Sequence, residues 1–308
     1  MPVEQSILSN VIKGRINRPH KLIIYGPDGV GKTTFAAGAP APLFLGAEDG
    51  TNNMDVSRLS NLKTFLDFKN AFIALEKEKH PYKTVVIDSL DWLETIVWDY
   101  VVKSENKPNI TSIDDFGYGK GYAHALDEWR SLLPLVDSIR DKGMNFIAIA
   151  HSKIKTFQDP STPQGYDRYQ LKLHDGAAAL WREAMDTVLF ANYQTDTSNE
   201  DKKRGFGDGE RFLYTERRPG FDAKNRNGLP FKMAFNDTNG WDVYAEAMTK
   251  GEPEKADTIL AQIVGLKSQV KNQALIPQIE SAITKAGTSA VELTKIKNRL
   301  EATIGTGA

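Results

Sequence analysis

Three consecutive residues near the amino terminus, Gly31-Lys32-Thr33, have the types needed to hold a polyphosphate. With Gly26 they complete the spacing G-x-x-x-x-G-K-[ST], in which glycines let several backbone N–H groups turn inward around the phosphates. The Lys32 ammonium then reaches the β- and γ-phosphates, and the Thr33 hydroxyl ligates Mg²⁺. ATP and Mg²⁺ are the predicted cofactors, and the predicted contact loop is Gly26, Pro27, Asp28, Gly29, Val30, Gly31, Lys32, Thr33 and Thr34.

The residues around this loop predict the elements that position it. The apolar run KLIIY comes directly before the loop and TTFAA follows it. A strand followed by the loop and a helix is the context that phosphate binding requires, because the start of the helix faces the same phosphates. A chance glycine-rich turn does not account for both flanks.

Two carboxylates are placed to complete a hydrolytic site. Asp88 ends the apolar run Val85-Val86-Ile87, and we expect it to hold the Mg²⁺ shell together with Thr33, although an acid at this position can also cap the next helix. Glu48 follows the run 42–47 and is the predicted base for the attacking water, with Asp49 as its competitor. Carboxyl ends of parallel strands meet at one sheet edge, which would aim Glu48 at the γ-phosphate, but either acid could also be a solvated loop residue.

Composition narrows the class of protein. The 308 residues are 40% hydrophobic and 26% charged, which is typical of a globular protein with a sizeable core. The absence of cysteine excludes disulfides and thiolate zinc sites, and the five histidines lack metal-ligand spacing. No apolar run is long enough to span a membrane, so we expect a cytoplasmic protein, in the host cytoplasm if it is phage-encoded, with no membrane partner. The net charge of −1 means that any nucleic-acid surface must be local.

Short apolar runs alternate with segments of helical period along most of the chain. Strands are predicted at 21–25, 42–47, 84–88, 145–150 and 187–193, and helices near 32–38, 63–79, 90–103, 120–142 and 176–186. This alternation predicts an α/β fold with a mostly parallel sheet and helices on both faces. Segments 211–217 and 230–235 are expected to add an edge hairpin. Three amphipathic patches, near 254–270, 273–286 and 289–303, predict a helical appendage, giving domains 1–17, 18–250 and 251–308.

The motifs together resemble one family. YGPDGVGKTTFAA, VVIDSL, FGYGKGYAHALDEW and NFIAIAHSKIK are similar to segments of phage-encoded RecA-like nucleotide-binding proteins, which act as single-strand annealing proteins. The resemblance covers about residues 18–240. It implies a RecA-like P-loop ATPase core that binds single-stranded DNA, assembles into a filament or ring, and hydrolyses ATP between subunits.

The resemblance also implies roles for three further residues. His151 follows the strand 145–150, where the superfamily places a polar sensor of the γ-phosphate, although many relatives have glutamine there. A strand-end histidine satisfied by backbone groups is the alternative. Lys224 and Arg226 resemble a basic pair that reaches the neighbouring subunit's phosphates, and a solvated hairpin tip is the alternative for them.

Cations and aromatic residues in two loops are candidates for DNA contact. Lysine and arginine track phosphates while rings stack on bases, and loops of the RecA-like family line a DNA channel. Segment 201–232 adds local charge, with nine cations against five acids. Acids within 152–175 leave ordinary surface as an alternative. The predicted DNA-binding residues are Lys120, Tyr122, Lys153, Lys155, Arg168, Tyr169 and Lys172.

Three functions remain open at this point. The first is an ATP-dependent recombination protein that anneals or pairs strands. The second is a replicative-helicase-like or helicase-loading ATPase with the same core. The third is a P-loop kinase or nucleotide-gated regulator, although no lid rich in catalytic arginines is recognisable. The appendage could bind a partner such as a single-strand-binding protein.

Overall fold

The computed structural model describes residues 11, 13–14, 18–46, 51, 53–194, 209–250, 256–267, 270, 275–287 and 290–305. The chain divides into two compact units, Met1–Ala247 and Met248–Ala308. Glu48 and Asp49 lie outside the described residues, as do Lys202, Lys203 and Arg204.

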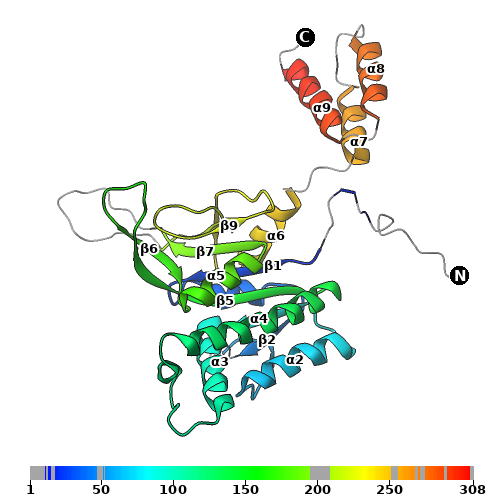
Figure 1. Cartoon of the computed structure of the whole chain (residues 1–308). Helices are drawn as coiled ribbons and strands as arrows, with labels where there is room; N and C mark the ends of the chain where they lie inside the picture. The colour runs from blue at the N-terminus through cyan, green and yellow to red at the C-terminus, as the bar shows by residue number, and fades with distance from the viewer. Residues whose placement is uncertain are drawn as a thin grey trace, which may run out of the picture. The chain divides into compact units, whose positions relative to one another are not determined.

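The larger unit is built on a mostly parallel sheet, as predicted (Figure 1). Its strand order is β10-β8-β7-β1-β5-β4-β2-β3, and only β8 and β10 in this path run antiparallel to their neighbours. The strands are β1 (Lys21–Gly26), β2 (Pro42–Gly46), β3 (Ser57–Leu59), β4 (Thr84–Asp88), β5 (Asn145–Phe157), β7 (Thr187–Tyr193), β8 (Arg211–Tyr214) and β10 (Lys232–Phe235). Two more strands pair outside this path, β6 (Tyr166–Leu171) with β5 and β9 (Lys224–Asn225) with β7.

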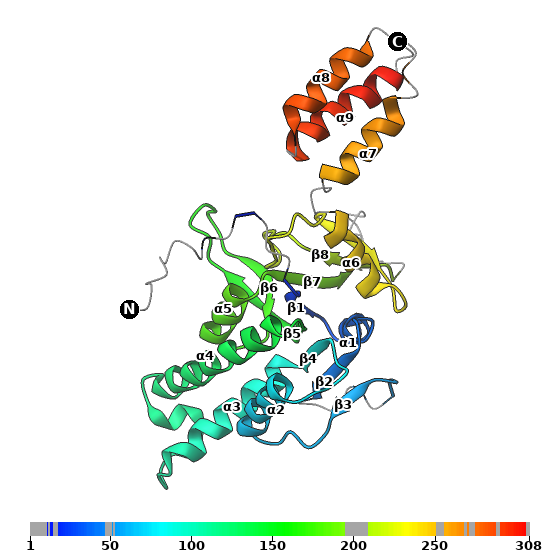
Figure 2. The same cartoon turned by 90° about the vertical axis from the view of Figure 1, so that its right-hand side faces the viewer.

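Helices cover both faces of this sheet, which is why its central strands are apolar throughout (Figure 2). Ile23 and Tyr25 of β1 share one buried cluster with residues of α2 (Phe65–Lys77), α3 (Leu90–Glu105), α4 (Lys120–Asp141) and α5 (Asp175–Ala184). On the other side, Phe35 of α1 (Lys32–Ala37) meets Trp241 of α6 (Gly240–Lys250), with ring centroids 5.8 Å apart. A short 3-10 helix, Ile113–Phe116, precedes α4.

The predicted loop 152–175 is largely a hairpin, so that expectation was wrong. Strand β5 continues past its apolar part to Phe157, and β6 pairs with it from Ser152↔Leu171 to Phe157↔Tyr166. The alternating pattern HSKIKTF and the Pro/Gly-containing turn after it carried this signal. The edge hairpin of β8 and β10 is confirmed, whereas β3, β9 and α6 were not predicted.

The described residues of the smaller unit form three helices, α7 (Ala256–Lys267), α8 (Ile276–Ala286) and α9 (Ala290–Gly305), one in each of the amphipathic patches. They pack around five buried side chains, Ile259, Ile263, Val270, Leu293 and Leu300. Among the described residues of either unit, no helix is long and apolar enough to cross a membrane.

Candidate functional site

The loop between β1 and α1 has the backbone that phosphate wrapping requires. Gly29 and Gly31 adopt φ angles of 73° and 99°, in the left-handed region that L side chains rarely occupy. A Cβ on Gly26 would lie 2.0 Å from the Ala191 carbonyl oxygen, so only glycine fits where β1 passes β7. The three glycines are therefore fixed by geometry, and they leave the backbone N–H groups of the turn available to an anion.

Lys32 is buried beneath this loop. Its Nζ donates to the carbonyl oxygens of Gly26 at 3.1 Å and Pro27 at 2.8 Å. Only 6% of the residue is exposed. The ammonium is thus held at the turn by neutral carbonyls, and phosphate oxygens are stronger acceptors for a charged donor.

Asp88 and Thr33 meet although their elements are far apart in sequence. The Thr33 Oγ1 donates to Asp88 Oδ2 at 2.9 Å. Asp88 ends β4, which is separated from β1 by β5. The carboxylate reaches the loop because the parallel register brings the ends of β1, β5 and β4 to the same sheet edge.

These two side-chain oxygens fit a magnesium ion whose remaining ligands are supplied by water and by phosphate oxygens. Mg²⁺ is commonly held by one or two protein oxygens plus phosphates rather than by a protein cage. The described residues contain no cluster of three or more His, Cys, Asp or Glu side chains able to hold a metal. The hydroxyl–carboxylate pair at the loop therefore matches the chemistry of Mg²⁺ bound together with a nucleotide.

His151 bridges the phosphate loop and helix α3. In the register of β1 and β5 it lies opposite Gly26. Its Nδ1 is 2.8 Å from Asp91 Oδ2, its backbone N–H donates to Asp91 Oδ1 at 3.0 Å, and its Nε2 is 3.3 Å from Asp28 Oδ1. The hydrogen bond to Asp91 raises the pKa of the imidazole above its ordinary value. The polar group expected after this strand thus lies beside the loop.

Asp91 was missed by the sequence analysis. It lies in the first turn of α3, three residues after Asp88, and its side chain is only 7% exposed. Burial alone would raise the pKa of this carboxyl, but the hydrogen bonds from His151 outweigh burial and lower it. The D-x-x-D spacing at a strand-to-helix junction was the available signal, and only the fold brings it against His151.

A pocket of about 490 Å³ lies on the other side of Asp91. The Tyr122 ring stacks on His174 with centroids 4.4 Å apart, and Trp98 meets Tyr122 edge-on at 5.4 Å. We call this the aromatic pocket, and its lining residues are Asp91, Trp92, Glu94, Thr95, Trp98, Tyr122, Lys153, Lys172, Leu173 and His174. Three predicted DNA-binding residues from separate segments therefore line one cavity, which is linked to the phosphate loop by the contacts of His151 with Asp91 and with Asp28.

Glu94 is a buried acid in this pocket. Burial raises its pKa to about 7, although both carboxylate oxygens accept from the His174 N–H, at 3.0 and 2.9 Å, and Lys153 lies nearby. Its neutral and charged forms are therefore balanced near physiological pH.

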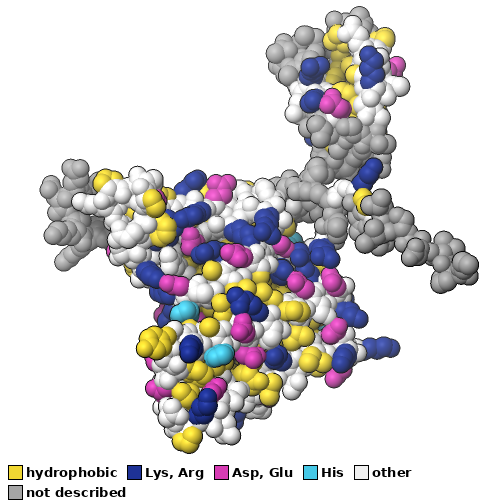
Figure 3. All heavy atoms as spheres, viewed as in Figure 1, with side chains coloured by type: hydrophobic (Ala, Val, Ile, Leu, Met, Phe, Trp, Pro, Cys, Tyr) yellow, Lys and Arg dark blue, Asp and Glu magenta, His cyan; other side chains and the backbone are white. Residues whose placement is uncertain are grey.

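The other predicted DNA-binding residues are dispersed. Lys120 is exposed at the start of α4, and Lys155 pairs with Asp175 on the hairpin. Arg168 is only 3% exposed, with its Nε on the Pro219 carbonyl and its guanidinium 3.9 Å above the Phe157 ring. Tyr169 is packed against the core, with its ring 5.1 Å from that of Phe190. Arg168 is thus buried and Tyr169 is partly buried, whereas the predicted DNA-binding role needs both side chains at the surface. On the face in Figure 3, cationic and acidic side chains are interspersed.

Lys224 does not lie at a free hairpin tip. It belongs to β9, and its Nζ donates to three carbonyl oxygens at the end of α5, those of Arg182, Glu183 and Met185 at 2.9, 2.8 and 2.5 Å. Burial lowers the pKa of this amine. A lysine that satisfies the last carbonyls of a helix is a capping residue. The Lys224 amine is therefore engaged within its own chain, which fits neither the predicted reach to a neighbouring subunit nor the alternative of a solvated tip.

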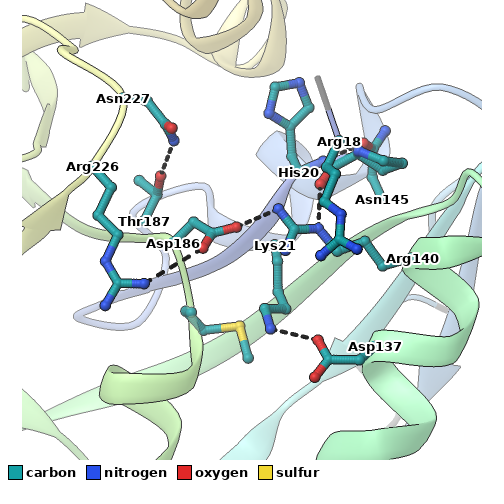
Figure 4. A network of polar contacts seen from close by, with 12 residues as sticks. Arg18, His20, Lys21, Asp137, Arg140, Asn145, Asp186, Thr187, Arg226 and Asn227 are labelled. Carbon is teal, nitrogen blue, oxygen red and sulfur yellow. Dashed lines mark hydrogen bonds and ion pairs between the residues drawn. The ribbon is translucent and has the colours of Figure 1, made fainter. Parts of the chain in front are cut away.

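Arg226 lies at the amino edge of the sheet, beside the start of β7 (Figure 4). Its guanidinium is 3.7 Å from Asp186, whose other oxygen accepts from Arg140, and it is 60% exposed. The phosphate loop follows the opposite end of β1, a strand about 20 Å long. Arg226 is therefore on the wrong edge to reach the phosphates of its own chain.

Comparisons with known proteins agree with this geometry. A family model described as an AAA domain matches residues 18–227, more than half of the chain. The SPbeta prophage-derived uncharacterized protein YorG of Bacillus subtilis (strain 168) is 25% identical over 151 residues, 48% of this chain and 44% of that protein. The chain thus spans less than half the length of this curated relative.

Two solved structures are also similar. The RadB recombinase has a TM-score of 0.36 at 13% identity, over 72% of this chain and 90% of that one. The flagellar accessory protein FlaH from Methanocaldococcus jannaschii has a TM-score of 0.36 at 12% identity, over 71% of this chain and 86% of that one.

Proposed function

The chain belongs to the AAA domain family and is a P-loop ATPase, and on this premise we propose that it is an ATP-dependent recombination protein. It binds single-stranded DNA, anneals or pairs strands, and hydrolyses ATP with Mg²⁺ at a site completed by a second copy. The observation that supports this most is the bridge from Asp28 through His151 to Asp91, which joins the phosphate loop to the aromatic pocket.

The chemistry at the loop assigns one task to each residue. Backbone N–H groups of the turn wrap the phosphates, and Lys32 exchanges the Gly26 and Pro27 carbonyls for phosphate oxygens. Thr33 and Asp88 hold the Mg²⁺, which neutralises phosphate charge. Water attacks the γ-phosphorus, the bond to the ADP oxygen breaks, and Glu48 takes the proton of the water. Thr34 follows in the first turn of α1 and is the last residue of the proposed phosphate contact loop.

His151 is proposed to report the state of the γ-phosphate. Asp91 fixes its ring so that Nε2 faces the loop, where Asp28 now occupies it at 3.3 Å. A γ-phosphate would compete with Asp28 for this nitrogen, and the raised pKa favours the protonated, donating imidazole. Asp91 also lines the aromatic pocket. A change in its contact with His151 therefore alters the lining of the pocket that is proposed to bind DNA.

Single-stranded DNA is proposed to enter the aromatic pocket. Bases stack on exposed rings such as Trp92, while Lys153 and Lys172 approach the backbone phosphates. Lys120 and Lys155 extend the same contact. The pocket also holds Asp91 and Glu94, but Asp91 is paired with His151 and Glu94 has a pKa of about 7, so neither presents a full unpaired negative charge.

Arg226 is proposed to act on the phosphates of a neighbouring copy, since it lies on the edge opposite its own loop. Lys224 is assigned to the cap of α5 instead. A single-strand-binding protein is a further proposed partner, with the unit Met248–Ala308 as its contact.

ATP turnover with and without single-stranded DNA, measured across protein concentration, tests this function. We expect stimulation by DNA that grows as the protein assembles. Strand displacement in addition would favour a helicase. Turnover that ignores DNA at every concentration would reject both and favour a kinase or regulator.

A further inference from the structure

A second pocket, of about 420 Å³, is more strongly charged than the aromatic pocket. Two carboxylates line it, those of Glu183 and Asp222. Five cations line it as well, which leaves a net charge of +3, and they are Arg168, Arg182, Arg217, Lys224 and Arg226. We call this the arginine pocket.

One carboxylate serves three guanidinium groups here. Asp222 lies 2.9 Å from Arg182, 3.6 Å from Arg217 and 3.6 Å from Arg168. The Asp222 side chain is only 12% exposed, so its charge faces the three arginines rather than solvent. One negative charge among three positive ones leaves an excess of positive charge at the centre of the pocket. This excess positive charge is unfavourable unless a bound anion neutralises it.

The cations differ in how many of their donors are used. Lys224 caps α5 and Arg168 is held by Tyr166, Pro219 and Asp222, so both are structural. Within the described residues, the Arg182 guanidinium makes one hydrogen bond, to Asp222, and its side chain is 37% exposed. In the same part of the chain, the Arg217 guanidinium makes no hydrogen bond, lies 3.6 Å from Asp222 and 5.8 Å from the centroid of the Phe157 ring, and its side chain is 58% exposed. A guanidinium offers five N–H donors, so Arg182 and Arg217 retain most of theirs.

We propose that the arginine pocket binds a backbone phosphate of single-stranded nucleic acid, through Arg182 and Arg217, with Asp222 and Arg168 holding the site together. This proposal rests on the proposed function, because the ligand is the strand that the ATPase binds. Forked guanidinium donors match phosphate oxygens, and a backbone contact is indifferent to sequence. The Phe157 ring beside the pocket has Arg168 over it, so the site is one for phosphate rather than for a stacked base.

The test measures the binding of a labelled oligothymidylate to the full chain by fluorescence anisotropy, at several salt concentrations. Arg182→Gln/Arg217→Gln should bind at least about tenfold more weakly, and its salt slope should fall by between about 0.7 and 1.4, since each lost phosphate contact on a single strand contributes about 0.7. Arg182→Lys/Arg217→Lys keeps the charge and should retain the slope while losing part of the affinity.

Matched controls separate this site from general charge loss and from unfolding. Arg58→Gln/Arg130→Gln removes two exposed arginines elsewhere and should bind as the wild type does. In the double variant Asp222 keeps its ion pair with Arg168, so chemical denaturation should still show a cooperative unfolding transition, which reports that the variant is folded.

Each contrary result is distinct. Unchanged binding by the folded Arg182→Gln/Arg217→Gln variant overturns the arginine pocket and leaves the proposed function standing. A wild-type chain that binds no strand overturns both. Normal strand binding with turnover lost only at high protein concentration would mean that the phosphate belongs to the nucleotide of a second copy, and this too overturns the proposal.

Discussion

At the scale of single residues, two cations that are close in sequence, Lys224 and Arg226, have different roles in the structure. Lys224 and Arg226 are two positions apart and were expected to act as a pair. The Lys224 amine is held by carbonyl oxygens at the end of α5, whereas the Arg226 guanidinium is exposed beside Asp186. Substitutions at these positions should therefore have different consequences.

Lys224→Met should lower the free energy of unfolding by about 1–2 kcal/mol, because three helix-end carbonyls lose their donor. Chemical denaturation measures this change. Arg226→Gln, at an exposed position, should leave stability within about 0.5 kcal/mol but reduce ATP turnover in the assembled protein. If Lys224→Met were as stable as the wild type, the capping role would be wrong.

Lys32→Ala should abolish ATP turnover, and Glu48→Gln should bind ATP but hydrolyse it at least about a hundredfold more slowly, as expected for loss of a general base. Binding of a fluorescent nucleotide, measured beside turnover, separates the two effects. Asp49→Asn is the matched control for Glu48. Normal turnover by Glu48→Gln would transfer the base assignment to another residue.

Glu94 makes stability depend on pH. Its pKa in the folded protein, about 7, lies above its ordinary value of 4.5, so the folded state favours the protonated carboxyl. The free energy of unfolding should therefore fall as pH rises from about 4.5 to 7. Glu94→Gln removes this contribution and should gain up to about 3 kcal/mol relative to wild type between about pH 5 and pH 8, since one pKa unit corresponds to about 1.4 kcal/mol.

Urea denaturation of the wild type and of Glu94→Gln, at about pH 5 and about pH 8, measures this difference in the free energy of unfolding. The exposed Glu78→Gln is the control and should follow the wild type at each pH. A Glu94→Gln variant with the same pH dependence as the wild type would show that the buried carboxyl does not titrate in this range.

At the scale of elements, the extension of β5 and the start of α3 determine how the two candidate sites communicate. Strand β5 carries His151 beside the phosphate loop and Lys153 into the aromatic pocket two residues later. Helix α3 places Asp91 and Glu94 on one face, because residues three apart are neighbours on a helix. A change at the nucleotide thus has a short path to the pocket.

The stacked ring on α4 offers a test of this arrangement. Tyr122→Ala should weaken binding of single-stranded DNA by about tenfold, because a base stacked on an aromatic side chain contributes about 1–3 kcal/mol. Fluorescence anisotropy measures it. Tyr118→Ala, at a fully exposed ring outside the pocket, should change the affinity little. Equal effects at both positions would place the bases on the surface loop instead.

At the scale of the whole molecule, the opposite locations of the phosphate loop and Arg226 make assembly part of the chemistry. Turnover per chain should therefore rise with protein concentration in the wild type. In Arg226→Gln this rise should be largely lost. Turnover that is independent of concentration in the wild type would mean that each chain has a complete site.

The phosphate loop could be predicted from local features of the chain alone, because glycine spacing, a preceding strand and a following helix are all contiguous in sequence. Apolar periodicity predicted the five central strands and their parallel arrangement for the same reason. It missed the β5–β6 hairpin, where polar alternation looked like a loop, and it could not exclude Arg168 from the surface. Glu48 stays a prediction, since it lies outside the described residues.

The contacts between distant side chains could be identified only from the folded chain. Asp91 contacts His151 across 60 positions, and Lys224 reaches the end of α5 across about 40, through pairings that strand order and register set. The type of a side chain alone cannot distinguish a cation that caps a helix from one whose donors are available to bind a phosphate. That difference depends on which carbonyls and carboxylates the fold brings within hydrogen-bonding distance.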